Sequence, residues 1–138
     1  MPVSSTMWKT AAILYAIAIP GHIAGGLKLI HPLLNKIPVT KKEDKVGQRS
    51  AQNCYNYVNV SLAIAGLLNW QWARTRGPQT FEEKIIYWTL LATHLAYGYR
   101  YAQVGEYSVL CVMWVAPALS LAGYQLDGPH ASPIQASS

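Results

Sequence analysis

Residues 49–68 read RSAQNCYNYVNVSLAIAGLL, and this stretch decides the expected fold. Its second half is almost wholly apolar, which is typical of a helix that lies in a membrane. At about 3.6 residues per turn, Arg49, Asn53 and Asn56 fall on one face of that same helix. Amides in hydrocarbon cost free energy unless they are hydrogen-bonded, so this stripe predicts either part of a ligand site or a polar contact between helices.

The composition of the whole chain extends this expectation to a membrane protein of one domain. Of its 138 residues, 51% are apolar and only 12% are charged, about half the charged share of a typical soluble protein. The mean hydropathy is +0.13. Four segments with few charges each approach the roughly 20 residues that span a bilayer. We therefore predict an all-α bundle of four transmembrane helices over residues 8–126, with helices at about 10–30, 51–73, 81–102 and 108–126, and a disordered polar tail over 127–138.

Basic residues gather around the first connection, which we expect to run from Leu33 to Gly47 after the first helix ends at His31–Pro32. By the positive-inside rule, this loop lies in the cytosol and both termini lie on the opposite side. The net charge of +5 flanks helices and predicts no nucleic-acid partner. The first apolar segment is too long for a secretory signal and is expected to be retained. The basic cluster comprises Lys28, Lys36, Lys41, Lys42, Lys45 and Arg49.

The cysteines and histidines do not have the spacing of a metal site. Cys54 and Cys111 lie inside predicted helices without a Cys-x-x-Cys pair, so we expect both to be buried small side chains. His22 and His94 have no intramembrane carboxylate beside them, and no metal site is predicted. His22 follows Pro20–Gly21, and it could line a cavity or bond a carbonyl that the proline frees.

The third apolar segment carries the candidate catalytic residues. His94, Tyr97 and Tyr101 are spaced i, i+3 and i+7, so they share one helix face. Histidine can move a proton near neutral pH and tyrosine can donate a hydrogen bond to a substrate, although an interfacial tyrosine and a simply hydrogen-bonded histidine would give the same pattern. The other aromatic residues are expected to form an interfacial belt: Tyr99, Tyr107, Trp70, Trp72, Trp88 and Trp114.

The turn before this segment contains a signal for the start of a helix. Thr80 precedes Phe81, and Glu83 follows three residues later. A threonine and a glutamate at this spacing satisfy each other's backbone N–H groups, an arrangement known as a capping box. We therefore predict that the third helix starts directly after Thr80.

The order and spacing of these motifs resemble the MAPEG family, the membrane-associated proteins in eicosanoid and glutathione metabolism. The leukotriene synthase branch has Arg-Ala-Gln-Val-Asn-Cys-Ser-Glu-Tyr in its second helix, and Arg49, Asn53, Cys54 and Tyr57 match it in register. A Tyr-(x)3-Tyr-Ala pattern is matched by Tyr97, Tyr101 and Ala102, and Lys28 falls where the family often has a basic residue. The resemblance implies a divergent member related to the leukotriene and prostaglandin E synthases and microsomal glutathione transferases.

The resemblance implies a homotrimer in the endoplasmic reticulum that binds glutathione between subunits and acts on a lipophilic small molecule among membrane lipids. It implies a transfer, reduction or isomerisation reaction. Asn56 stands where the family has glutamate, and residues 108–110 lack the arginine that usually stabilises the thiolate. The implied cofactor-binding residues are Lys28, Arg49, Asn53, Asn56 and Tyr57, and the catalytic candidates are Tyr97, Tyr101 and His94.

Two alternatives follow from the residues that differ from the family. The chain could be a cofactor-free isomerase or cyclase of a lipophilic metabolite that uses His/Tyr acid–base chemistry. It could also be a non-catalytic membrane subunit or lipid-binding protein whose polar stripe only holds helices together.

Overall fold

The computed structural model describes residues 2–127, and every regular element in that range is helical. The predicted all-α class is confirmed. The predicted disordered tail falls almost wholly outside the described residues. The elements are α1 (Val3–Gly25), the π-helix η1 (Gly26–Ile30), α2 (His31–Asn35), α3 (Lys42–Thr75), α4 (Phe81–Gln103), the π-helix η2 (Cys111–Val115) and α5 (Ala116–Asp127).

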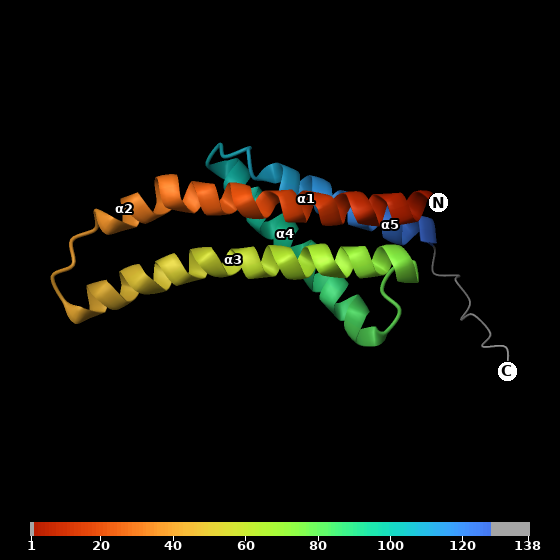
Figure 1. Cartoon of the computed structure of the whole chain (residues 1–138), viewed down its shortest axis with the longest axis horizontal. Coiled ribbons are helices and arrows are strands. Elements are labelled where there is room, and N and C mark those ends of the chain that lie inside the picture. The colour runs from red at the N-terminus through yellow and green to blue at the C-terminus, as the bar shows by residue number, and fades with distance from the viewer. Residues whose placement is uncertain (1, 128–138) are drawn as a thin grey trace.

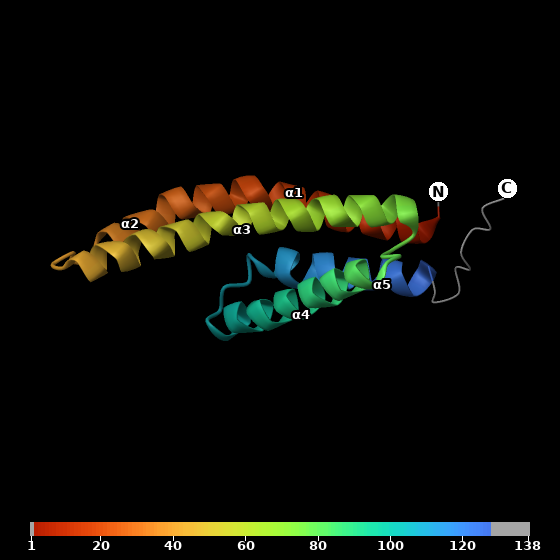
Figure 2. The same cartoon turned by 90° about the horizontal axis from the view of Figure 1, so that it is seen from below.

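These elements form four long rods in two layers. One layer holds α3 and the continuous helix made of α1, η1 and α2, and the other holds α4 and the η2–α5 rod (Figure 2). The hairpin between α2 and α3 extends beyond the ends of the other two rods, as Figure 1 shows. The start of α1 and the end of α5 lie at the opposite end of the molecule. The predicted polar residues of α3 therefore lie toward the hairpin and away from the end where α1 begins.

In both π-helices, a proline lies two residues after the last residue of the helix. His31 N–H bonds the Gly26 carbonyl and Ala116 N–H bonds the Cys111 carbonyl, each five residues back, and Pro32 and Pro117 come next. A proline has no N–H, and the wider π turn makes room for it where the hydrogen-bond pattern changes. The predicted helix end at His31–Pro32 is therefore wrong, because the helix continues through this proline to Asn35.

The first connection is also shorter than predicted, because α3 begins at Lys42 rather than at about residue 51. The carboxylate of Asp44 accepts hydrogen bonds from the backbone N–H groups of Thr40 and Lys41 and from the Thr40 hydroxyl, at 2.9–3.0 Å. These bonds hold the chain where it enters the helix, so a charged segment that looks like a loop is the first turn of α3.

The start of α4 is confirmed as predicted. Glu83 N–H donates to the Thr80 hydroxyl at 3.2 Å, and Thr80 N–H donates to the Glu83 carboxylate at 3.3 Å. The same carboxylate accepts from Gln79 N–H at 2.6 Å and from the Gln71 side chain at 2.9 Å. Glu83 therefore caps α4 and also connects it to the last turns of α3.

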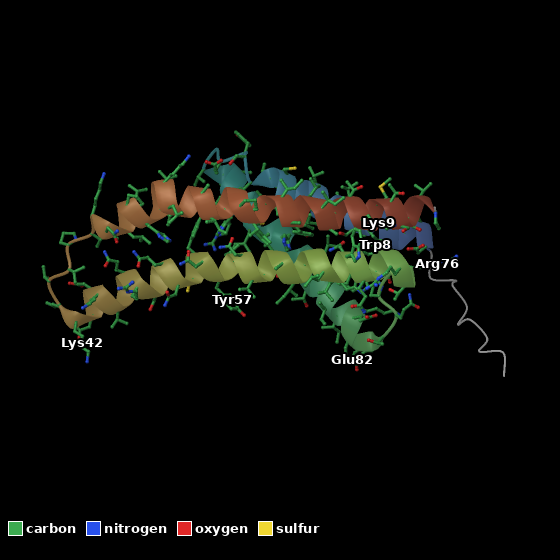
Figure 3. All side chains as sticks on the ribbon, in the orientation of Figure 1. Trp8, Lys9, Lys42, Tyr57, Arg76 and Glu82 are labelled. Atoms are coloured by element: carbon green, nitrogen blue, oxygen red, sulfur yellow. The ribbon has the colours of Figure 1, made fainter. Side chains whose placement is uncertain are left out.

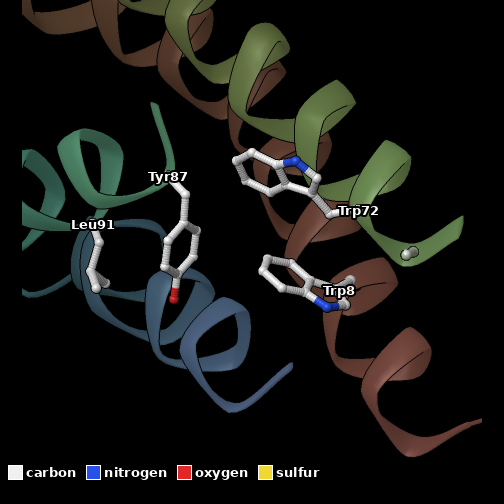
Figure 4. Close-up of a cluster of buried hydrophobic side chains, with 5 residues drawn as sticks. Trp8, Trp72, Tyr87 and Leu91 are labelled. Atoms are coloured by element: carbon white, nitrogen blue, oxygen red, sulfur yellow. The ribbon is translucent and has the colours of Figure 1, made fainter. Parts of the chain in front are cut away.

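An aromatic cluster fills the core at the end of the bundle where α1 begins and α5 ends (Figure 4). Trp8 packs edge-to-face against Trp72 at 5.5 Å between ring centroids and against Tyr87 at 5.8 Å. Trp72 is only 1% exposed, so its predicted place in an interfacial belt is wrong. Its packing against Trp8 puts it on the α3 face that α1 covers. Large planar side chains thus join α1, α3 and α4 at this end.

A second core cluster lies beside it and contains mostly small residues. Ala11, Ala65 and Ala116 are fully buried, which lets α1, α3 and α5 approach closely. Between the two clusters, the buried Ser120 hydroxyl donates to Asn69 at 2.6 Å, and the Asn69 amide donates to the Ala65 carbonyl at 2.8 Å. Asn69 is therefore a hydrogen-bonded contact between helices.

One of the described helices has the length and apolar composition needed to cross a membrane, the continuous helix Val3–Asn35. It comprises α1, η1 and α2 and lies near the N-terminus.

Candidate functional site

The α1–α3 contact contains a cluster of polar aromatic and amide side chains centred on His22. His22 Nδ1 lies 3.1 Å from the side-chain oxygen of Asn59. Because an amide oxygen only accepts hydrogen bonds, Nδ1 carries a proton in this arrangement. Asn59 thus fixes both the orientation of the ring and its tautomer.

Tyr55 packs on the flat face of the same imidazole. Its ring stacks on His22 with centroids 4.0 Å apart and an interplanar angle of 13°. Its hydroxyl donates to the backbone carbonyl of His22 at 3.0 Å. The histidine side chain therefore bonds an amide of α3, and the tyrosine, not the histidine, supplies a partner for a carbonyl of α1. His22 therefore does not bond a carbonyl that Pro20 frees, which was one of the two roles that we expected for it.

The π-helix η1 shapes the wall against which Tyr55 packs. A Cβ atom added at Gly26 would lie 2.6 Å from Tyr55 Cε1, so only glycine fits there without moving the ring. His31, at the end of η1, meets Tyr55 edge-on at 6.2 Å between centroids, and its Nε2 is buried without a hydrogen-bond partner among the described residues. Local π turns of this kind often occur at functional sites.

The predicted polar stripe on α3 lies on the outside of the chain. The side chains of Arg49, Asn53 and Asn56 are exposed and make no hydrogen bond within residues 2–127. Tyr57 is 65% exposed and projects from the side of α3 that faces away from α1 (Figure 3). The stripe is thus available to a ligand or to another chain, and it is not the contact between α1 and α3.

The predicted α4 residues divide between the core and the surface. His94 Nδ1 bonds the Leu90 carbonyl at 2.7 Å, and its ring meets Tyr15 edge-on at 5.3 Å, so His94 is held by its own helix and by the core. Tyr97 and Tyr101 are 52% and 38% exposed.

Lys28 and the two cysteines complete the predicted set. Lys28 lies inside η1, with its side chain exposed, rather than at the end of the first helix. Cys54 and Cys111 are exposed on the chain, so the prediction that both are buried is wrong. Within residues 2–127, no group of three or more His, Cys, Asp or Glu side chains could hold a metal ion.

Sequence reasoning identified His22 as a candidate but not its partners. Asn59 lies one turn beyond Asn56 and borders the predicted stripe, which is the signal that could have drawn attention to it. Tyr55 gave no comparable signal, because its role depends on the close approach of two glycines on a different helix.

Comparisons with known proteins add no relative to this description. No protein-family model matches the chain, and neither a curated protein nor a solved structure matches it.

Proposed function

We propose that this chain is a MAPEG-like integral membrane enzyme that acts on a lipophilic small molecule and binds the polar part of a ligand on the outer face of α3. The observation that carries the proposal is the exposed stripe of Arg49, Asn53 and Asn56, whose side chains have no partner within residues 2–127. Polar side chains on the lipid-facing side of a helix are costly unless something pairs with them.

A second copy of the chain would cover this stripe. A guanidinium pairs with a carboxylate in two parallel hydrogen bonds, and an asparagine amide can both donate and accept. Glutathione offers two carboxylates and two amides, so it fits this set of donors and acceptors without the family's glutamate at residue 56. The site would then lie between subunits of a homotrimer, with Tyr57 and the exposed Tyr97 and Tyr101 at its edges.

In the proposed topology, the four rods lie in the membrane of the endoplasmic reticulum and the α2–α3 hairpin lies in the cytosol. It is supported by the apolar helix Val3–Asn35 and by the common end at which α1 begins and α5 ends. Six basic residues lie on or beside the hairpin, on the side that the positive-inside rule assigns to the cytosol.

Calorimetry with the detergent-solubilised chain tests the ligand. We expect saturable glutathione binding, and we expect Arg49→Ala to weaken it at least tenfold, because about 1.4 kcal/mol corresponds to a tenfold change and a charge-assisted pair contributes at least that much. Arg74→Ala, an exposed arginine at the opposite end of α3, is the matched control and should bind as the native chain does. Absence of glutathione heat in the native chain would remove glutathione from the proposal.

Native mass spectrometry of the same sample tests the assembly. We expect the native chain to form a trimer that retains glutathione. We expect Arg49→Ala to form a trimer that does not. A monomer that binds glutathione with the native affinity would contradict a site between subunits.

A further inference from the structure

His22 keeps one ring nitrogen for a molecule outside the chain. Nδ1 is engaged by Asn59 at 3.1 Å. Nε2 makes no hydrogen bond within residues 2–127, and it is not fully buried. Nε2 is therefore accessible at the surface of the α1–α3 contact.

The tautomer that Asn59 imposes makes Nε2 a hydrogen-bond acceptor. A neutral imidazole has one N–H and one lone pair, and the proton lies on Nδ1 when Nδ1 faces the Asn59 oxygen. A molecule that pairs with Nε2 must therefore bring a donor, such as a hydroxyl group. A carbonyl, ether or ester oxygen offers nothing to this nitrogen.

The surroundings select a lipophilic donor. His22 lies within Val3–Asn35, the helix with the length and composition to cross a membrane, and its neighbour Ile23 is exposed. Hydrocarbon supplies no water to pair with an acceptor, so an unpaired Nε2 costs free energy there. A membrane-soluble hydroxyl compound removes that cost.

The acceptor is also held rigidly. Tyr55 stacks on the imidazole at 4.0 Å and is itself anchored by its hydroxyl bond to the His22 carbonyl at 3.0 Å. Gly26 lets this ring lie against η1 with no space to spare. An acceptor that is fixed before a ligand arrives loses little side-chain entropy on binding.

We propose that His22, Asn59 and Tyr55 form a binding site for the hydroxyl group of a lipophilic molecule, in which the hydroxyl donates to His22 Nε2. This inference rests on the proposed function only for the placement of α1 in a membrane. It names a substrate class, lipophilic alcohols and phenols, and a site on α1 that is separate from the Arg49 stripe.

A pair of probes that differ only in the donor tests the site. Nonylphenol has a hydroxyl group, and nonylanisole carries a methyl ether in its place. With the full chain in detergent micelles and ¹⁵N-labelled histidine, nonylphenol should shift the His22 Nε2 resonance saturably, and nonylanisole should not. Equal responses to the two probes, or no response to nonylphenol, would overturn the proposal without any variant having to fold.

Two histidine variants localise the response. His22→Phe keeps an aromatic ring for Tyr55 to stack on and should weaken nonylphenol binding about tenfold, the effect of one lost hydrogen bond in an apolar site. His94→Phe is the matched control, because His94 is bonded to the Leu90 carbonyl, and it should leave the affinity unchanged. Unchanged binding to His22→Phe would place the phenol elsewhere and refute the site.

A third variant tests the role of Asn59. Asn59→Leu removes the acceptor that fixes the tautomer, so the His22 resonances should show a mixture of tautomers and nonylphenol should bind several-fold more weakly. A native-like tautomer in this variant would contradict the proposed role of Asn59. Glutathione calorimetry and the phenol response test separate sites. A chain that binds nonylphenol but not glutathione would therefore contradict the proposed function and leave the His22 site standing.

Discussion

Trp8 and Asp127, which lie 119 residues apart, are joined by a hydrogen bond of 3.1 Å from the indole Nε1 to the carboxylate. This bond ties the second turn of α1 to the last residue of α5. A Cβ added at Gly123, one turn before Asp127, would lie 2.9 Å from the same indole, so the ring fits closely against α5. The two ends of the described chain are thus fastened together around one fully buried tryptophan.

We predict that Trp8→Phe lowers the free energy of unfolding by about 2–4 kcal/mol, since it removes buried ring volume and the indole donor together. Asp127→Ala removes only the acceptor and should cost about 1–2 kcal/mol. Unfolding in mixed detergent micelles measures both values. The double variant should cost less than the sum, and strict additivity would mean that the hydrogen bond contributes nothing.

Two glycines of the first helix should respond in opposite directions to alanine. Gly26→Ala would push Tyr55 off His22, because its Cβ would lie 2.6 Å from the ring, and it should cost about 1–3 kcal/mol. Gly21 has nothing within 4 Å of an added Cβ, so Gly21→Ala should be neutral or stabilise by up to about 1 kcal/mol. Thermal unfolding compares them, and equal melting temperatures would contradict the close packing at η1.

Local sequence signals predicted the helical elements more successfully than they predicted the contacts between helices. The capping box at Thr80 and Glu83 depends on residues three positions apart, and the structure confirms it. The charged segment before Gly47 was predicted as loop, because its charges suggested solvent rather than the cap that Asp44 makes. The proline at residue 32 suggested a helix end, because the preceding π turn has no recognised sequence signal.

The candidate site could be predicted only in part for the same reason. Periodicity placed Arg49, Asn53 and Asn56 on one face but could not say whether that face meets α1 or the outside. His22 stood out as an ionisable residue in an apolar segment. Its bond to Asn59 joins residues 37 positions apart, and such contacts are decided by helix packing.

We predict that Tyr87→Phe leaves the stability unchanged or raises it by about 1 kcal/mol. The Tyr87 hydroxyl is buried and has no hydrogen-bond partner among the described residues, and an unpaired buried hydroxyl costs free energy. It lies beside a small cavity of about 10 Å³ that Asn69 and Ser120 also line. Chemical unfolding measures the change. A loss above about 1 kcal/mol would show that the hydroxyl is paired in solution, for which a bridging water has the right size.

The start of α3 should lose stability in acid through Asp44. Hydrogen bonds from the Thr40 hydroxyl, then from the backbone N–H groups of Lys41 and Thr40, lower the pKa of the Asp44 carboxyl below its ordinary value. A lowered pKa in the folded state means that the stabilisation is fully present above the ordinary aspartate value. It is lost as the pH falls through the lower value of the folded chain. The first turn of α3 should therefore open in acid before the aromatic core does.

Hydrogen exchange of the backbone amides at residues 41–45 measures this opening, with Asp44→Asn as the reference at each pH. Asparagine keeps an acceptor oxygen but carries no charge, so the native chain should be better protected near neutral pH. The difference between the two proteins should vanish as the pH falls through the Asp44 pKa. A constant difference at all pH values would show that the carboxylate charge does not hold this turn, and that the cap depends only on its hydrogen-bond geometry.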